Sequence, residues 1–225
     1  MHRRRIVASV IGGSTLKRGK SKRAAAAPLP FFGPAPMKPS VIKLERTHER
    51  WATMSIATIR MPDGRTFLRD VEDHGCAAAV LPFDPARKTA LLVEQLRAAE
   101  LIAVGATHSL EAIAGLVEGE DDAAATAKRE ALEEGGLQLG ALEHVATAWS
   151  MPGVSTERMA LYLAEYRAED RVGDGGGVAH EDEEVRVVEL GLKELAELMA
   201  ADGIVDMKTL ALVQALRLRR PELFD

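Results

Sequence analysis

Cysteine and long apolar stretches are nearly absent from this sequence. The single cysteine among 225 residues, Cys76, excludes a disulfide within the chain. No stretch of about 18 or more consecutive apolar residues occurs, so the sequence contains no candidate membrane-spanning helix and predicts no membrane partner. With 47% hydrophobic and 28% charged residues, the composition is that of a globular protein with one domain of ordinary size plus additions. We expect a cytoplasmic location.

Acidic residues are missing from the first 44 positions, which contain ten Lys or Arg. Because the whole chain has 29 basic and 34 acidic residues, the remainder holds 19 against 34, and its formal charge is near −15. Residues 1–40 also carry five prolines and a run of four alanines, and they lack helical or strand periodicity. We interpret them as a disordered basic extension. A targeting peptide, a weak nucleic-acid-binding arm and a start codon placed too early are the alternatives.

Two further regions are predicted from the pattern of apolar residues. Residues 41–73 read as an N-terminal β unit, in which strands at 51–61 and 65–73 are joined by the turn Pro62-Asp63-Gly64. Residues 74–225 read as one domain that mixes strands with helices. Its expected strands are 77–83, 89–96, 142–149, 158–166 and 185–190, and its two last helices carry apolar stripes at Leu192, Leu195, Leu198 and Met199 and at Leu210, Val213 and Leu216.

Three carboxylates lie on one expected helical turn. Glu130, Glu133 and Glu134 stand at i, i+3 and i+4, so a helix projects them from a single face, where like charges repel. A hard divalent cation such as Mg²⁺, which prefers oxygen ligands, explains such a cluster. A solvated acidic helix face is the alternative interpretation of these three residues alone.

The surrounding stretch resembles the Nudix box, G-x5-E-x7-R-E-U-x-E-E-x-G-U, where U is a bulky aliphatic residue. Two positions depart from the pattern, because Asp121 replaces a glutamate and Ala131 is small. Seven of the nine fixed positions match: Gly115, Arg129, Glu130, Glu133, Glu134, Gly136 and Leu137. The resemblance implies an α/β fold, the Nudix α/β/α sandwich with a mixed sheet, for residues 74–225.

The resemblance also assigns a metal site. It makes Glu130 and Glu134 the principal Mg²⁺ ligands, with Glu133 as a third and the backbone carbonyl of Ala114 completing the set; Mn²⁺ is an acceptable substitute. Arg129, beside these ligands, is expected to pair with a carboxylate and to orient the helix.

Segments outside the box resemble bacterial ADP-ribose pyrophosphatases and the related GDP-mannose hydrolases. The similar segments are 76–85, 93–97, 110–115 and 151–158, whereas Gly-Gly-Gly-Val at 175–178 is nearer to the GDP-mannose hydrolases. The family's catalytic glutamate falls on Glu181 in the acidic loop at 180–186, with Glu183 as the second choice. The alternative interpretation of this loop is an exposed acidic segment with no specific role.

Substrate contacts are expected from five positions. By resemblance, Arg97 binds a phosphate, Arg69 contacts the nucleotide and Glu157 hydrogen-bonds the terminal ribose. Trp51 is a candidate for stacking on the base, although a lone Trp in a strand is more often part of a core. Gly115 allows a turn beside the substrate that a Cβ would obstruct.

The implied reaction is Mg²⁺-dependent hydrolysis of the pyrophosphate bond of a nucleoside diphosphate sugar. We expect ADP-ribose to give AMP and ribose 5-phosphate; GDP-mannose, giving GMP and mannose 1-phosphate, is the alternative. A non-catalytic Nudix-fold nucleotide sensor is the alternative of another class, which the complete set of three glutamates disfavours. Because N-terminal strands exchange between subunits in this subfamily, the resemblance also implies a homodimer formed through residues 41–73, and it makes nucleic acid an unlikely partner.

Overall fold

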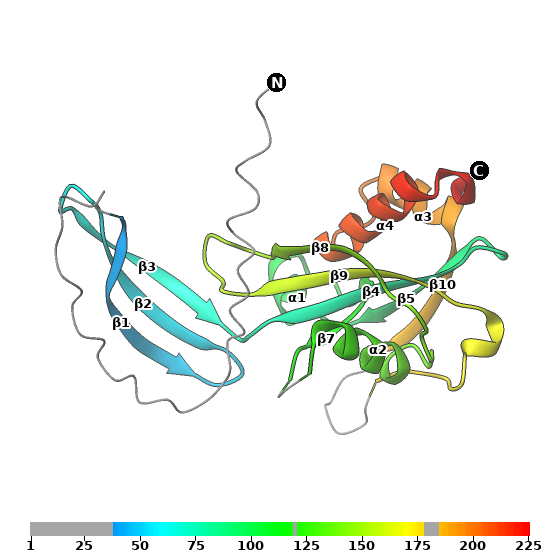
Figure 1. Ribbon diagram of the computed structural model, residues 1–225, viewed down its shortest axis with the longest axis horizontal. Helices are drawn as coiled ribbons and strands as arrows, with labels where there is room; N and C mark the ends of the chain where they lie inside the picture. Colours follow the sequence, from blue (N-terminus) through cyan, green and yellow to red (C-terminus); the bar gives the residue numbers. More distant parts are fainter. Residues whose placement is uncertain (1–37, 119–120, 178–184) are drawn as a thin grey trace. The chain divides into compact units, whose positions relative to one another are not determined.

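The computed structural model describes residues 38–118, 121–177 and 185–225, which contain a three-stranded sheet, a seven-stranded sheet and the helices packed on the latter (Figure 1). The predictions for residues 1–37 lie outside the described residues. Among the helices of the described ranges, none is long and apolar enough to cross a membrane.

The seven-stranded sheet is mixed. Its strand order is β10-β5-β4-β9-β8, with β6 added to β5 and β7 added to β4. The β4–β9 pair is parallel and the other pairs are antiparallel. The strands are β4 (Ala77–Asp84), β5 (Thr89–Gln95), β6 (Ser109–Glu111), β7 (Ile113–Leu116), β8 (Glu143–Trp149), β9 (Arg158–Glu165) and β10 (Arg186–Gly191). All five strands expected in this domain are therefore confirmed, whereas the short β6 and β7 were not predicted.

Helices cover both faces of this sheet, as the α/β/α prediction requires (Figure 1). The residues of β4 alternate between two cores: Leu81 and Phe83 pack with α3 (Leu192–Ala200) and α4 (Met207–Arg219), whereas Val80 packs with α2 (Ala123–Glu133). A strand that is buried on both faces reads as a continuous apolar run, and every residue of β4 is indeed buried.

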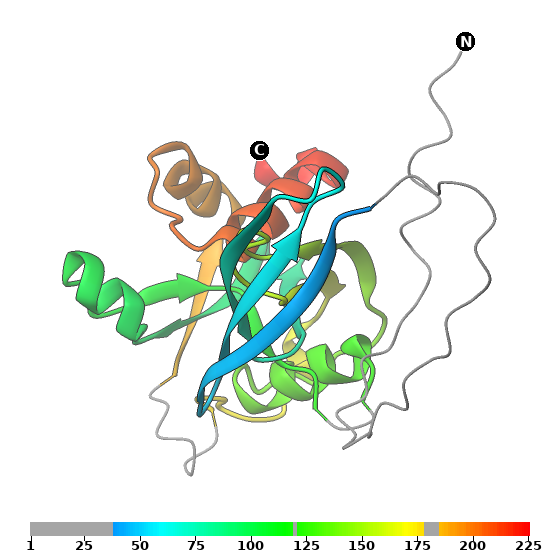
Figure 2. The ribbon, with the colours of Figure 1, turned by 90° about the vertical axis from the view of Figure 1, so that its left-hand side faces the viewer.

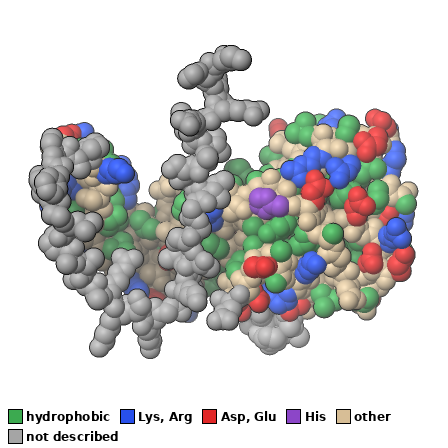
Figure 3. Space-filling model, viewed as in Figure 1, with side chains coloured by type: hydrophobic (Ala, Val, Ile, Leu, Met, Phe, Trp, Pro, Cys, Tyr) green, Lys and Arg blue, Asp and Glu red, His purple; other side chains and the backbone are tan. Residues whose placement is uncertain are grey.

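On the face shown in Figure 3, Lys and Arg side chains are interspersed with Asp and Glu.

Shorter helical segments complete the described chain. Helix α1 (Ala98–Val104) follows β5 directly and has no buried residue, which explains why no apolar stripe predicted it. Two 3₁₀ turns, η1 (Ala168–Asp170) and η2 (Pro221–Phe224), follow β9 and α4.

The N-terminal unit has one more strand than predicted. The two expected strands are β2 (Thr53–Arg60) and β3 (Thr66–Asp73), joined by a tight turn at Gly64 with a positive φ of 86°. Strand β1 (Ser40–Glu49) pairs antiparallel with β2 and forms one edge of this sheet (Figure 2). All ten β1 residues are exposed, so the strand has no buried face to impose the alternation by which strands are recognised.

The end of β3 is hydrogen-bonded to the loop that follows β8. The amide of Glu72 donates to the carbonyl of Val154 at 2.8 Å, and the amide of Thr156 donates to the carbonyl of Glu72 at 2.9 Å. The hydroxyl of Thr156 also donates to Asp73 at 2.9 Å. These bonds bring the loop at 151–157, singled out in the sequence, to the chain segment that links the two sheets.

Candidate active site

The box glutamates are carried by helix α2, whose ends are well defined. The Asp122 side chain accepts a hydrogen bond from the Ala125 amide at 2.7 Å and so caps the first turn. Ala127 and Ala131 are fully buried against the sheet. Ala131 departs from the bulky residue of the box, and its small side chain lets the helix lie close to the strands.

Helix α2 packs tightly against β7 at Gly115. A Cβ on Gly115 would lie 1.7 Å from Oε1 of Glu130, so a larger residue at this position would displace the Glu130 carboxylate. Gly115 directly follows Ala114, whose carbonyl is a predicted metal ligand. The structure therefore places the Glu130 carboxylate against the backbone segment that the resemblance selected.

Arg129 lies between two of the glutamates. Its guanidinium pairs with Glu130 at 2.7 Å and with Glu133 at 2.7 Å, and it donates to the carbonyl of Leu116 at 3.4 Å. Burial lowers the pKa of Arg129, but the charges of Glu130 and Glu133 outweigh burial and raise it. In the described part of the chain, no three His, Cys, Asp or Glu side chains form a cluster that is already arranged to hold a metal ion.

Glu134 ends the helix and is only 4% exposed. The glycine-rich segment after η1 folds back onto this end: Gly176 donates to the carbonyl of Glu134 at 2.8 Å, and Gly177 donates to that of Glu133 at 3.1 Å. A Cβ on Gly175, whose φ is +71°, would lie 2.2 Å from the Glu134 carbonyl oxygen. These glycines therefore satisfy carbonyls at the end of α2 that would otherwise lack partners.

The oxygen donors around α2 fit a hard divalent cation. The Glu130 side chain is 12% exposed and that of Glu133 33%, and Glu134 is nearly buried. The missing Cβ of Gly115 leaves room for the Glu130 carboxylate beside β7. Carboxylates and a carbonyl are the ligands that Mg²⁺ and Mn²⁺ take in proteins.

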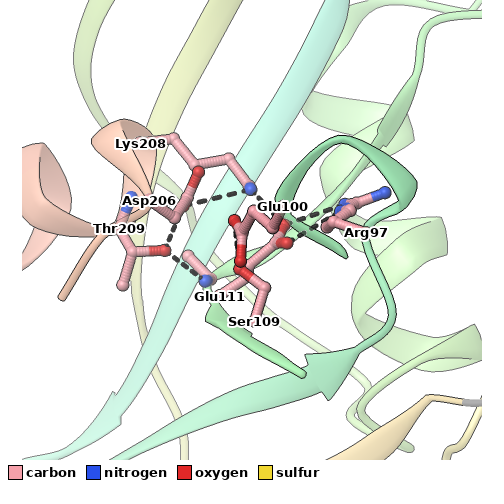
Figure 4. A network of polar contacts seen from close by, with 8 residues as sticks. Arg97, Glu100, Ser109, Glu111, Asp206, Lys208 and Thr209 are labelled. Carbon is pink, nitrogen blue, oxygen red and sulfur yellow. Dashed lines mark hydrogen bonds and ion pairs between the residues drawn. The ribbon is translucent and has the colours of Figure 1, made fainter. Parts of the chain in front are cut away.

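Arg97 follows β5 and pairs with a glutamate that the sequence did not single out. Its Nε and Nη2 donate to the two oxygens of Glu111 at 2.7 and 2.8 Å (Figure 4). Glu111 is 2% exposed and also receives Lys208 of α4. Burial raises the pKa of Glu111, but the Arg97 hydrogen bonds and the nearby charges of Lys208 and Arg97 outweigh burial and hold it at about 2.

Trp51 and Glu157 meet at His74, directly after β3. The Trp51 ring stacks on the His74 imidazole with centroids 4.6 Å apart, and Trp51 is 71% exposed. His74 Nε2 lies 3.1 Å from Glu157, and Nδ1 contacts Glu72. Trp51 lies before β2 and is not a core residue. No pattern in the sequence singled out His74, so its contact with two carboxylates was not predicted.

The remaining predicted residues lie at the surface or outside the described ranges. Arg69, on β3, is exposed, and its guanidinium lies 4.4 Å from the centre of the Phe67 ring. Glu181 and Glu183 belong to residues 178–184, which lie outside the described residues.

Comparison with known proteins decides the family. The NUDIX domain model matches residues 73–209. The chain belongs to the Nudix family. Sequence relatives include the GDP-mannose pyrophosphatase of Cronobacter sakazakii (strain ATCC BAA-894), 38% identical over 67% of this chain and 78% of that protein, and the GDP-mannose pyrophosphatase of Escherichia coli O1:K1 / APEC, 32% identical over 67% and 78%. A solved structure described as an ADP compounds hydrolase is similar in fold, with a TM-score of 0.67 and 15% identity over 84% of this Nudix chain and 98% of that chain.

Substituting Gly115 tests the close packing of α2 on β7. We expect Gly115→Ala to lower the hydrolytic turnover of this Nudix protein by at least about 10²-fold, because the new Cβ displaces Glu130. Gly140→Ala is the matched control, since a Cβ there meets nothing within 4 Å. Turnover and thermal unfolding are measured for both variants. A Gly115→Ala protein with wild-type turnover contradicts the assignment.

The pH dependence of stability tests the His74 contacts. Burial lowers the pKa of His74, but the hydrogen bonds to Glu72 and Glu157 outweigh burial and raise it above its ordinary value of 6.5. Folding therefore stabilises the protonated ring; this contribution is complete below about pH 6.5 and is lost as the pH rises through the raised pKa. We expect urea unfolding to show this loss and His74→Gln to remove it.

His144→Gln is the control for this measurement, because His144 contacts the neutral residues Thr147 and Tyr162. It should retain the pH dependence of the wild type. Equal slopes in the wild type and the His74→Gln variant contradict a charged His74.

Proposed function

We propose that this Nudix hydrolase cleaves the pyrophosphate bond of a nucleoside diphosphate sugar with the help of Mg²⁺. The observation that carries the proposal is the packing of the box helix, where Gly115 leaves room for the Glu130 carboxylate beside β7. The names of the sequence relatives support a nucleotide-sugar substrate. The products are a nucleoside monophosphate and a sugar phosphate, because water adds to one phosphorus and the bridging oxygen leaves with the other.

The metal ligands in this proposal are Glu130, Glu134, Glu133 and the Ala114 carbonyl. A bound Mg²⁺ neutralises the phosphates and lowers the pKa of a coordinated water. Arg129 pairs with both Glu130 and Glu133 and so offsets the repulsion between their carboxylates before the cation binds. The proposed role of Arg129 is therefore to keep these carboxylates oriented in the absence of the cation.

The proposed general base is Glu181, with Glu183 as the second choice. Support comes from the described residues on either side of this loop. Gly177 is hydrogen-bonded to the carbonyl of Glu133 on the box helix, and Val185 belongs to the core that packs on α2. The described residues on both sides of 178–184 therefore contact α2 or its core, which supports the assignment of the base to this segment.

Substrate recognition is proposed for Arg97, Arg69, Glu157 and Trp51. Arg97 donates Nε and Nη2 to Glu111 but keeps 41% of its side chain exposed, so part of its guanidinium faces solvent, where a phosphate can approach. The exposed Trp51 ring, backed by His74, offers a flat surface for a base. Glu157 keeps an oxygen 3.1 Å from His74, and its hydrogen bond to a ribose is the least supported of these contacts.

We also propose a homodimer that forms through the N-terminal sheet. Support comes from β1, where Val41 and Leu44 expose about 60% of their surface. A second copy that covers these side chains removes apolar surface from water.

The catalytic base is tested by two neighbouring substitutions. We expect Glu181→Gln to lower kcat by about 10²–10⁴-fold with little change in KM, because the loss concerns proton transfer and not binding. Glu183→Gln is the comparison, and Glu197→Gln on the exposed face of α3 is the control. A larger loss in Glu183→Gln assigns the base to Glu183, and unchanged kcat in both excludes the loop.

The substrate is tested on a panel of ADP-ribose, GDP-mannose, ADP-glucose and NADH, with Mg²⁺ and a coupled phosphatase. ADP-ribose is the substrate predicted from the sequence, and GDP-mannose is favoured by the names of the relatives. We expect the highest kcat/KM on one of these two. Absence of turnover on every compound contradicts the proposed reaction and returns the nucleotide-sensor alternative.

A further inference from the structure

A buried ionic network connects the arginine at the end of β5 with the start of α4 (Figure 4). At its centre, Glu111 receives Nε and Nη2 of Arg97 at 2.7 and 2.8 Å and the ammonium of Lys208. Lys208 also lies 3.1 Å from Asp206, which caps α4 by accepting the Thr209 amide at 2.9 Å. We call these five residues the Glu111 network.

The network reaches the backbone that leads into the Nudix box. The hydroxyl of Thr209 accepts a hydrogen bond from the amide of Ala112 at 2.6 Å and donates its own proton to Asp206. Ala112 directly follows Glu111 and stands two residues before Ala114. Hydrogen bonds from α4 residues therefore hold the strand segment that carries Glu111 and so fix the position of its carboxylate relative to Arg97.

Arg97 is held from both directions. Its backbone begins α1, where its carbonyl accepts the Leu101 amide at 3.0 Å, and α1 is tied to β6 by the Ser109 hydroxyl, which donates to Glu100 at 3.0 Å. Its planar fork makes two parallel bonds to one carboxylate, a geometry that fixes the plane of the guanidinium as well as its position.

Arg97 is the cation of the network that faces solvent. The positive charges of Arg97 and Lys208 are balanced by Glu111 and Asp206, and Lys208 is only 10% exposed. Arg97 is 41% exposed on its side chain and Glu111 only 3%, so the guanidinium lies where the buried network meets solvent. A buried ion pair adds little stability compared with apolar packing, which leaves orientation as the contribution of this network.

We propose that Glu111 is a positioning residue that presents the Arg97 guanidinium to the substrate's phosphates. The inference rests on the proposed function, since it takes Arg97 as a phosphate-binding group. Glu111 itself touches no substrate and acts only through Arg97.

The experiment is a double-mutant cycle between Glu111→Gln and Arg97→Ala, measured with whichever nucleotide sugar the wild type prefers. We expect KM to rise about 10-fold or more in each single variant, with kcat changed less than KM. In the double variant, Glu111→Gln should add nothing to the effect of Arg97→Ala, because its action passes through that side chain.

The chain offers a matched control in a second buried carboxylate–arginine pair. Asp84 accepts Arg87 Nε at 2.6 Å; the arginine side chain is again 41% exposed and the carboxylate 5%, but the pair lies where β4 ends and β5 begins, at the opposite end of β5 from Arg97. We expect Asp84→Asn to lower Tm without changing KM. A purely structural Glu111 would behave in the same way.

A conservative variant covers the case in which Glu111→Gln does not fold. Glu111→Asp keeps the charge beside Lys208 but draws the carboxylate back by one methylene, so Arg97 shifts. We expect KM to rise in this variant as well. A wild-type KM in Glu111→Asp, or in a folded Glu111→Gln, overturns the proposal. A rise in KM in the double variant that equals the product of the two single rises also overturns it.

Failure of the proposed function gives a different result. If the wild type hydrolyses nothing on the panel, the same cycle is measured by calorimetry as the Kd of ADP and GDP. These ligands keep the nucleoside and both phosphates and lack only the terminal sugar. A weaker Kd in Glu111→Gln that disappears in the Arg97→Ala background supports the positioning role without the reaction. An unchanged Kd in Arg97→Ala overturns it.

Discussion

The contact between the Glu130 carboxylate and the bare backbone of Gly115 is the constraint on which the site depends. It requires helix α2 to lie almost on the sheet, which the fully buried Ala127 and Ala131 permit and larger side chains would prevent. Strand β7, which carries Gly115, is paired in register with β4, where Ala78 lies opposite Gly115. Small residues therefore recur on both sides of this contact, where Ala127 and Ala131 pack on the apolar core formed with β4 and β7.

The far end of the same helix is fixed by a second close approach of backbone to backbone. A Cβ on Gly136 would lie 2.2 Å from the carbonyl oxygen of Gly173, and Gly175 approaches Glu134 as closely. Both glycines have positive φ, a conformation that other residues adopt at a cost of about 1 kcal/mol or more. The close packing of Gly173 and Gly175 against the end of α2 therefore gives these glycines a structural reason.

The sequence predicted those parts of the fold that bury an apolar face. Strands such as β4 and β5 and the helices on the sheet were found because burial imposes a period on the residues. Strand β1 and helix α1 have no buried residue, so no period marked them. The box was recognised because its residues lie close together in the chain. For the same reason, the positions of Glu130, Glu133 and Glu134 along α2 could be predicted from the sequence alone.

The partners of Arg97 and Glu157 could not be predicted from the sequence. Glu111 is 14 residues from Arg97, and Lys208 is 97 residues from Glu111, so neither spacing follows from a helix or a hairpin. Arg97 and Glu157 each meet an opposite charge supplied by a different segment of the chain. In this protein the apolar layers determine the fold, while carboxylates beneath the surface determine the direction in which its arginine and histidine side chains point.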